Sequence, residues 1–136
     1  MNVQIITPEK MVFTGQADGI TLPTVTGELT ILPGHVALVT PLRSGEIALH
    51  HGSERQHMAI HGGFVSVDGE TVKLLTDAAE LEEEVDERRA SEALERAKQL
   101  RETAVDATVS AEALGAIERA LTRLRLADRA KQRHRA

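Results

Sequence analysis

The sequence predicts a β domain followed by a two-helix hairpin, and three observations lead to this fold class. Residues 1–84 contain short β-branched runs that Gly, Pro, Asp and Asn interrupt at fairly regular intervals, as in antiparallel sandwiches and barrels. Residues 85–136 contain no Pro, and their apolar residues recur every three or four positions, as in amphipathic helices. Aromatic residues make up only 1% of the chain, so Val, Ile, Leu and Ala must build the core. We therefore expect a β domain over 1–84 and a helical domain over 85–136.

The β domain is expected to contain several short strands joined by tight turns. The expected strand runs, in chain order, are VQIIT, GITLPTVTGELTIL with a break at TVTGE, HVALVTPL, GEIALHH, RQHMAIHGGFVSV and TVKLLTDA. Asp68-Gly69 is expected at the tip of one hairpin, because Asp-Gly favours the two-residue turns that join antiparallel strands. HGSERQ is expected to form a second hairpin turn.

The helical domain is expected to be an antiparallel hairpin of two amphipathic helices. The helices are expected over ERRASEALERAKQLRETA and SAEALGAIERALTRLRLADRA, with a joint at residues 106–110 and Ser110 as the N-cap of the second helix. Ala dominates both apolar stripes, and each Ala side chain buries little surface. Because burial stabilises by roughly 25 cal/mol per Å² of apolar surface, the contact between the helices is expected to be weak. The hairpin is therefore either a weakly held, movable element or an ordinary stable appendage, and the pattern leaves both open.

Charge and composition exclude several functions. A net charge of -5 argues against nucleic acid as a main ligand, and the absence of Cys excludes disulfides and thiolate chemistry. No apolar stretch approaches the length that spans a membrane, so we expect no direct membrane insertion. The charges fall in blocks, acidic from Asp77 to Glu87 and basic from Arg119 onward. Such blocks are either solvated surface or surfaces matched to a partner.

Arginines in both helices suggest an anion site. Arg88 and Arg89 open the first helix, although cations are unfavourable near a helix N-terminus. Arg89 and Arg96 share one face of the first helix, and Arg119 and Arg123 share one face of the second. If the chain folds back at the expected joint, these four arginines border one groove that suits a polyphosphate.

Acidic residues near these arginines leave a second interpretation open. Asp86 and Glu80 would accept hydrogen bonds from a base or ribose, or would serve as counter-charges to the arginines. Alternatively, the arginines pair with glutamates four residues away along the helix. The two pairs of this kind are Glu84–Arg88 and Glu92–Arg96.

The histidines predict no catalytic or metal centre. His57 and His61 alternate with Met58 and Ile60, so we expect them on the opposite, solvent-facing side of a strand; a metal site there is the alternative. His35 is expected to form a loop hydrogen bond or a subunit contact. Because no Ser/His/Asp order or carboxylate pair stands out, we expect a protein that is not itself an enzyme.

Several motifs together resemble one known family. They are ITP at 6–8, GELTILPGHVALVTPL at 27–42, HGGFVSV at 61–67 and VDERRA at 85–90. In this order they resemble the epsilon subunits of bacterial F-type ATP synthases, along essentially the full chain. VDERRA is similar to the nucleotide motif of that family, an Ile or Leu followed by D-x-x-R-A.

The resemblance implies a fold, a place in an assembly and a regulatory role. It implies a ten-stranded β-sandwich, followed by two helices, in the central stalk at the cytoplasmic face of the bacterial membrane, where the subunit is peripheral. The sandwich would bind the γ subunit and the c-ring through Glu28, Pro33, Gly34 and His35. The helices would leave the enzyme free when folded, and would block ATP hydrolysis when extended to an acidic loop of the catalytic β subunit. The basic end of this chain suits such a loop by charge complementarity.

The resemblance also implies ATP as a regulatory ligand of the folded hairpin, with no metal or prosthetic group of the subunit's own. The matching positions are Glu80, Val85, Asp86, Arg89, Ala90, Arg96, Arg119 and Arg123. Val85 is one methylene smaller than the usual Ile or Leu, which would weaken packing against the base by about 0.8 kcal/mol.

Two other classes of function stay open alongside this one. A stand-alone ATP-sensing adaptor would be a stable monomer without affinity for γ. A small hydrolase would turn over ATP as an isolated chain. An epsilon subunit would bind γ tightly and would take part in ATP synthesis, driven by a proton or sodium gradient, only within its assembly.

Overall fold

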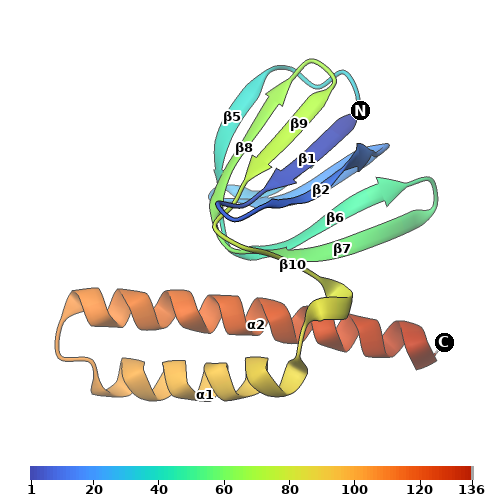
Figure 1. The fold of residues 1–136 in the computed structure, drawn as a ribbon. Coiled ribbons are helices and arrows are strands. Elements are labelled where there is room, and N and C mark those ends of the chain that lie inside the picture. The colour runs from blue at the N-terminus through green and yellow to red at the C-terminus, as the bar shows by residue number, and fades with distance from the viewer. Residues whose placement is uncertain (136) are drawn as a thin grey trace. The chain divides into compact units, whose positions relative to one another are not determined.

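The chain divides into two compact units, Met1–Leu81 and Glu82–Ala136 (Figure 1). The computed structural model describes residues 1–135, apart from the side chains of Glu83, His134 and Arg135. The predicted fold class is confirmed, since strands fill the first unit and two helices follow. The sequence-based division between residues 84 and 85 falls at the end of a short 3₁₀ helix, η1.

The first unit is built from ten strands. Their bounds are β1 Asn2–Ile6, β2 Met11–Gln16, β3 Gly19–Thr24, β4 Gly27–Ile31, β5 Leu38–Leu42, β6 Gly45–His51, β7 Glu54–Ile60, β8 Gly63–Asp68, β9 Thr71–Leu75 and β10 Ala79–Leu81. The hydrogen-bonded order is β10-β7-β6-β3-β5-β8-β9-β1-β2, and β4 pairs with the other edge of β3. A single residue pair, Thr24 with Leu42, joins β3 to β5, so this is where one layer of strands passes into the other.

Nearly all strand pairs are antiparallel, as expected, and one is not. β1 runs parallel to β9, with Asn2 opposite Thr71 and Ile6 opposite Leu75. Alternate residues of the strands turn inward, as the period of two requires. The largest fully buried side chains of this unit are Val3, Ile5, Ile20, Leu22, Ile31, Ile47, Leu49, Met58, Ile60, Val65 and Leu74. Aliphatic side chains therefore fill the core, as the shortage of aromatics predicted.

Two predicted hairpins are present, and one differs in its turn. β6 and β7 are joined through Gly52, which has a φ of 60°. β8 and β9 are joined through Gly69-Glu70, because Asp68 still pairs with Thr71 across the strands. The predicted Asp68-Gly69 tip is therefore one residue too early. Gly69 takes the left-handed conformation that such a turn needs, with a φ of 60°.

The second unit consists of η1 Glu82–Glu84, α1 Glu87–Thr103 and α2 Ala107–Arg135. Asp106 begins α2: its side chain accepts a 2.8 Å hydrogen bond from the backbone N–H of Val109. The predicted N-cap at Ser110 is wrong, since Ser110 lies within the first turn of the helix. Neither helix, as far as the described residues go, has the length and apolar content needed to cross a bilayer.

Alanines dominate the contact between α1 and α2. The buried side chains of α1 are Ala90, Leu94 and Ala97. On α2, Ala113, Ala120 and Ala127 are buried at intervals of seven residues. Small side chains allow close approach of two helices but remove little apolar surface from water. The buried surface between the helices is therefore small, which favours the movable alternative over the stable appendage.

Candidate functional sites

The start of α1 places the predicted nucleotide motif on a helix cap. Asp86 is the N-cap residue, and its Oδ1 accepts a 3.1 Å hydrogen bond from the backbone N–H of Arg89. Ala90 is buried in the helix contact, and Val85 is half-buried just before the helix. Capping and packing therefore account for Asp86 and Ala90 without a ligand, whereas the side chain of Arg89 is left exposed.

The predicted glutamate pairs of the arginines do not form. Arg88 pairs instead with Glu92, at 3.3 Å between Nε and Oε1, and its side chain is otherwise exposed. Glu92 is therefore the partner of Arg88 and does not form the predicted ion pair with Arg96. Among the described residues, the guanidinium groups of Arg89, Arg96 and Arg119 have no acidic partner.

Helix geometry puts these three arginines on one edge of the hairpin. Each directly precedes a buried alanine: Arg89 before Ala90, Arg96 before Ala97 and Arg119 before Ala120. The position before a core residue lies about 100° to one side of it around the helix. Because α1 and α2 are antiparallel, that side is the same edge of the pair for both helices.

Arg123 and Glu80, the two other residues predicted for the ATP site, have different surroundings. Arg123 lies one turn after Arg119, is half-buried and already has an interaction partner. Glu80 belongs to β10 in the first unit, where it pairs with Ala59 of β7. The structure therefore gathers the arginines within the second unit and assigns Glu80 to the first.

The predicted subunit-contact loop is exposed and apolar at its flanks. Pro33 and Gly34 form a tight turn, closed by a 3.1 Å hydrogen bond from the backbone N–H of His35 to the carbonyl oxygen of Leu32. Gly34 has a φ of 82°, which favours glycine. Leu32 and Val36, on either side of this turn, expose most of their side chains, and Glu28 is exposed on β4. The loop is therefore exposed and carries apolar side chains, and its role as a subunit contact stays a prediction.

A larger apolar surface escaped the sequence analysis. Five residues lie opposite one another on five neighbouring strands and share the outer face of the sheet, and we call them the apolar row. They are Pro41, Phe64, Leu75, Ile6 and Met11, on β5, β8, β9, β1 and β2. Phe64 is 54% exposed, Leu75 49% and Met11 51%. The sequence does carry a signal, since Ile5-Ile6, Phe64-Val65 and Leu74-Leu75 place apolar residues on both faces of a strand.

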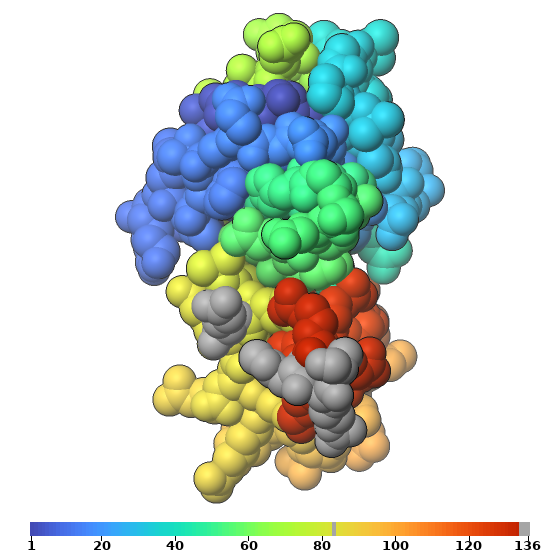
Figure 2. Space-filling view, turned by 90° about the vertical axis from the view of Figure 1, so that its right-hand side faces the viewer, coloured from blue at the N-terminus to red at the C-terminus, as the bar shows by residue number. Residues whose placement is uncertain are grey.

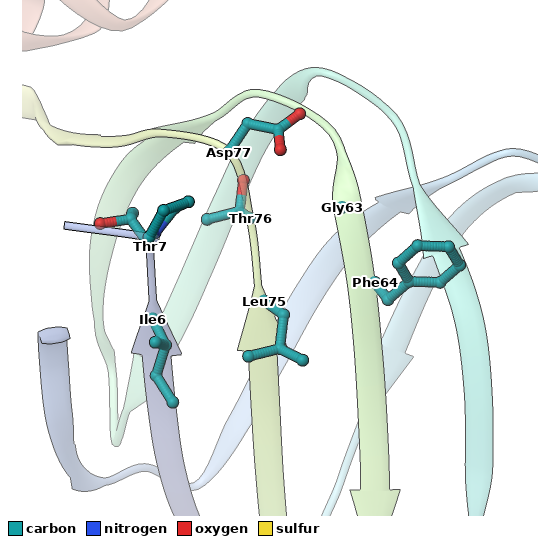
Figure 3. Close-up of a pocket in the computed structure, with 8 residues that line it drawn as sticks. Ile6, Thr7, Gly63, Phe64, Leu75, Thr76 and Asp77 are labelled. Atoms are coloured by element: carbon teal, nitrogen blue, oxygen red, sulfur yellow. The ribbon is translucent and has the colours of Figure 1, made fainter. Parts of the chain in front are cut away.

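A surface pocket opens at one end of the strands that carry the apolar row (Figure 3). Its volume is about 480 Å³, and Ile6, Leu75 and Phe64 lie in succession along it. Thr7, Thr76 and Asp77 provide the polar part of the lining. The pocket combines apolar walls with a carboxylate, which suits a protruding side chain of a partner protein.

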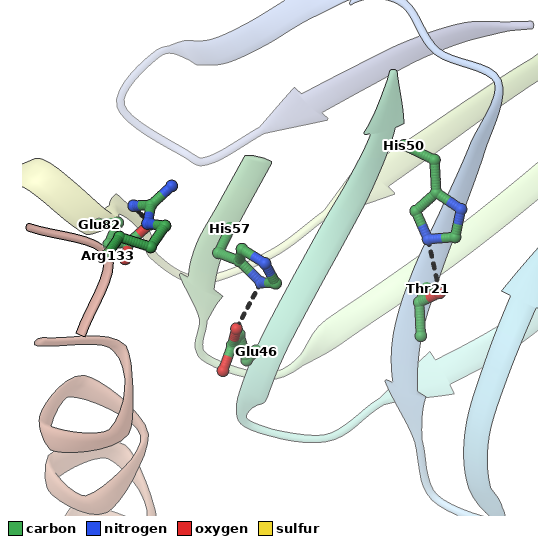
Figure 4. Close-up of polar contacts among 6 residues, drawn as sticks. All are labelled: Thr21, Glu46, His50, His57, Glu82 and Arg133. Carbon is green, nitrogen blue, oxygen red and sulfur yellow. Dashed lines mark hydrogen bonds and ion pairs between the residues drawn. The ribbon is translucent and has the colours of Figure 1, made fainter. Parts of the chain in front are cut away.

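The histidines are placed differently from the expectation. The His57 side chain is only 12% exposed and His61 is only 4% exposed, so the predicted solvent face is wrong at both positions. His57 Nδ1 lies 2.5 Å from Glu46 Oε1 (Figure 4). Within the part of the chain that the structure describes, no three His, Asp or Glu side chains are grouped to hold a metal ion.

His50 lies on β6 and forms a side-chain hydrogen bond to β3. Its Nε2 shares a 2.9 Å hydrogen bond with Thr21 Oγ1 (Figure 4). Burial lowers the pKa of His50 below its ordinary value, and the nearby Arg55 charge lowers this pKa further. The ring is therefore held neutral, which suits a structural hydrogen bond between β6 and β3 rather than proton transfer.

Comparison with known proteins gives the same family from two directions. A family model described as "ATP synthase, Delta/Epsilon chain, beta-sandwich domain" matches residues 1–82. The chain is 35% identical over 133 residues to the ATP synthase epsilon chain of Dehalococcoides mccartyi, which covers 97% of this chain and 95% of that protein. It is 43% identical over 98 residues to the ATP synthase epsilon chain of Halalkalibacterium halodurans, covering 72% and 74% of the two.

Solved structures agree on the fold. A chain in the Euglena gracilis mitochondrial ATP synthase, solved as OSCP, F1 and c-ring, superposes with a TM-score of 0.77 at 25% identity, covering 88% of this chain and 76% of that one. A chain of the Tetrahymena thermophila mitochondrial ATP synthase central stalk and c-ring gives a TM-score of 0.62 at 20% identity, covering 92% and 94%. The chain therefore belongs to the family of ATP synthase epsilon chains, which are non-catalytic subunits.

Proposed function

We propose that this epsilon chain docks on the γ subunit through the apolar row and thereby joins the central stalk. The observation that carries the proposal is the row itself, which exposes apolar side chains on five adjacent strands. Exposed apolar patches of this kind mark protein interfaces on soluble proteins. The pocket beside Phe64 and Leu75 would receive an anchor side chain of γ, as interface hot spots do.

The exposed loop would supply the second contact, to the c-ring. Leu32 and Val36 offer apolar side chains on either side of the Pro33-Gly34 turn. Glu28 and His35 would add polar contacts at its edge. Such a subunit would lie peripherally at the cytoplasmic face of the membrane and transmit ion-driven rotation, by protons or sodium, to ATP synthesis.

Binding to purified γ subunit tests the docking proposal. Phe64→Glu puts a charge in the middle of the apolar row, and we expect it to weaken γ binding at least about 30-fold, the loss of a roughly 2 kcal/mol hot spot. Thr14→Glu is the matched control, because Thr14 is exposed on β2 of the same face but pairs with Gln4 in a polar row. Equal affinity of both variants and the parent would reject the row as the γ contact. A chain with no affinity for γ at all would favour the stand-alone adaptor instead.

We further propose that the helical unit binds ATP and regulates hydrolysis by the assembled enzyme. The favouring observation is the line of Arg89, Arg96 and Arg119 along one edge of the hairpin, without acidic partners among the described residues. Like charges on one edge repel unless an anion lies among them, and the guanidinium fork suits phosphate oxygens. ATP would hold α1 and α2 together. Without it, the hairpin would extend toward the acidic loop of the catalytic β subunit and inhibit.

Calorimetric titration of the full chain with ATP, with and without Mg²⁺, tests this second proposal. We expect saturable heat in the parent and its loss in Arg89→Ala and in Arg119→Ala. Arg88→Ala is the matched control, since Arg88 neighbours Arg89 but pairs with Glu92 and points elsewhere on the helix. Absence of binding up to about millimolar ATP, or equal losses in all three variants, would remove the regulatory ligand. ATP turnover by the isolated chain would instead indicate a hydrolase.

A further inference from the structure

Two ion pairs connect the end of α2 to the acidic segment that precedes and opens α1. Lys131 Nζ lies 2.5 Å from Glu87 Oε2, and Arg133 pairs with Glu82 of η1 (Figure 4). Figure 2 shows the red part of α2 beside the yellow segment that leads into α1, and α2 contacts η1. We call these four side chains the charge clasp. The acidic and basic blocks noted in the sequence thus meet each other within the second unit.

The two pairs of the charge clasp differ in burial. The side chain of Glu82 is only 5% exposed, and its Oε1 is buried without a hydrogen-bond partner. A buried carboxylate is unfavourable unless a cation pairs with it, so Glu82 depends on Arg133. The Lys131–Glu87 pair is about half exposed on both sides, so dissolved salt weakens it.

Apolar packing contributes little to this part of α2 among the residues that the structure describes. α2 has 29 residues and α1 has 17, so α2 continues past the start of its partner helix. Ala127 is the last buried apolar residue described on α2, and Lys131, Gln132 and Arg133 are exposed as whole residues. The contact beyond Ala127 therefore depends on charge more than on apolar packing.

The charge clasp also agrees with the dipoles of both helices. Glu87 lies in the first turn of α1, where a negative charge is favourable. Lys131 and Arg133 lie near the C-terminal end of α2, where positive charges are favourable. Each helix therefore keeps its preferred charges whether the clasp is open or closed.

We propose that Glu82 and Glu87 are a built-in acidic partner for the basic end of α2, which must release Lys131 and Arg133 before another acidic surface can bind them. The inference deepens the proposed regulatory function, because it makes release of α2 a competition between two acidic partners. Opening is then promoted by ionic strength and by any acidic competitor. The charge clasp itself is a property of the isolated chain and needs neither nucleotide nor γ.

Distance measurement by pulsed electron spin resonance tests the charge clasp in the full chain. The chain contains no Cys, so spin labels at Ser91→Cys and Gln132→Cys report the clasp without background. In Lys131→Gln/Arg133→Gln we expect the population with long distances to rise about fivefold or more over the parent, because one exposed pair is lost and the buried Glu82 is left without its cation. Raising salt from about 20 to 500 mM should open the parent partly, because salt screens the exposed Lys131–Glu87 pair more than the buried Glu82. The same rise in salt should change the double variant less than the parent.

Two controls separate clasp opening from general loss of structure. Arg88→Gln/Lys98→Gln removes two ion pairs that lie within α1 and should leave the distance unchanged. Labels at Gln99→Cys and Ala111→Cys, near the turn of the hairpin, should not respond to the clasp variant or to salt. If the double variant loses helical circular dichroism, the single Lys131→Gln variant and the salt response of the parent decide instead.

Three results would overturn the proposal. They are a parent distance that does not respond to salt, equal opening in the clasp and control variants, and movement of the turn labels together with the clasp labels. Failure of ATP titration would not produce any of these, and an absent clasp would not abolish ATP binding, so the two proposals fail separately.

Discussion

Gly63 shows how one residue fixes the local course of the chain beside the candidate interface. Its φ is 109°, and a Cβ added there would lie 2.0 Å from the carbonyl oxygen of Leu75. The three nearest atoms all belong to the backbone of Leu75 and Thr76, so no rotation of a side chain relieves the contact. The close approach holds β8 against β9 and sets the position of Phe64, the next residue. Steric conflict with the backbone of β9 therefore explains why the second position of the GG pair in HGGFVSV is glycine.

Replacing Gly63 should be far more costly than replacing a turn glycine. We expect Gly63→Ala to lower the free energy of unfolding by about 3 kcal/mol or more, because both the backbone conformation and the Cβ contact are unfavourable. Gly52→Ala is the control: its φ is 60° and its Cβ would meet nothing within 4 Å, so about 1 kcal/mol is expected. Urea denaturation followed by circular dichroism measures both. Similar losses in the two variants would show that the Cβ contact with Leu75 is relieved by movement of the strands.

At the scale of elements, the two helices depend on their caps because their contact is made mainly by alanine. Asp86 caps α1 and Asp106 caps α2, each through a side-chain oxygen that accepts a backbone N–H three residues on. Helices with such narrow apolar faces gain little free energy from burying them, so capping contributes a large share of their stability. Asp86 therefore stabilises α1 whether or not a nucleotide binds.

The cap of α2 can be tested apart from the candidate ATP site. We expect Asp106→Ala to destabilise the helical unit by about 1 kcal/mol, and Asp106→Asn to be nearly neutral, because Asn caps as well as Asp. Helical circular dichroism during thermal unfolding measures the difference. If Asp106→Asn is as unstable as Asp106→Ala, the carboxylate charge acts in some other way than capping. The same substitution at Asp86, to Asn, would separate its capping role from any contact with a nucleotide.

At the scale of the whole molecule, the two units have different means of stability. The β unit has a core of Ile, Leu, Val and Met, whereas the helical unit buries mainly Ala. At roughly 25 cal/mol per Å² of apolar surface, the difference in side-chain size favours the β unit strongly. We therefore expect the β unit to be the more stable of the two and the helical unit to open more readily.

Separating the units should therefore give unequal fragments. We expect residues 1–81 to fold alone, with strand circular dichroism and a cooperative thermal transition. Residues 82–136 alone should lose a substantial part of their helicity, because short Ala-rich helices are marginal in water. Dichroism of the two fragments and of the full chain makes the comparison. Full helicity in the isolated 82–136 fragment would contradict weak packing of the hairpin.

The sequence predicted elements well and their precise contacts less well. Periodicity located the strands and helices because burial on one face imposes the period. Ser110 was chosen as a cap because it stands just before the apolar stripe, whereas Asp106 starts the helix one turn earlier. The apolar row could not be predicted, because residues as distant as Ile6 and Leu75 become neighbours only through strand register. His61 was misplaced because alternation gives a face of a strand but not what becomes of that face.

The parallel pairing of β1 with β9 has a consequence for synthesis of the protein. Of the ten strands, β1 is made first, but β9, which pairs with one of its edges, begins only at Thr71. Until β9 has left the ribosome, β1 can pair only with β2, and its other edge keeps its N–H and C=O groups free. Closure of the sheet must then wait for nearly the whole β unit, as expected for folds rich in distant contacts. The two helices follow the strands in the chain, so they are made only after the β unit can close its sheet.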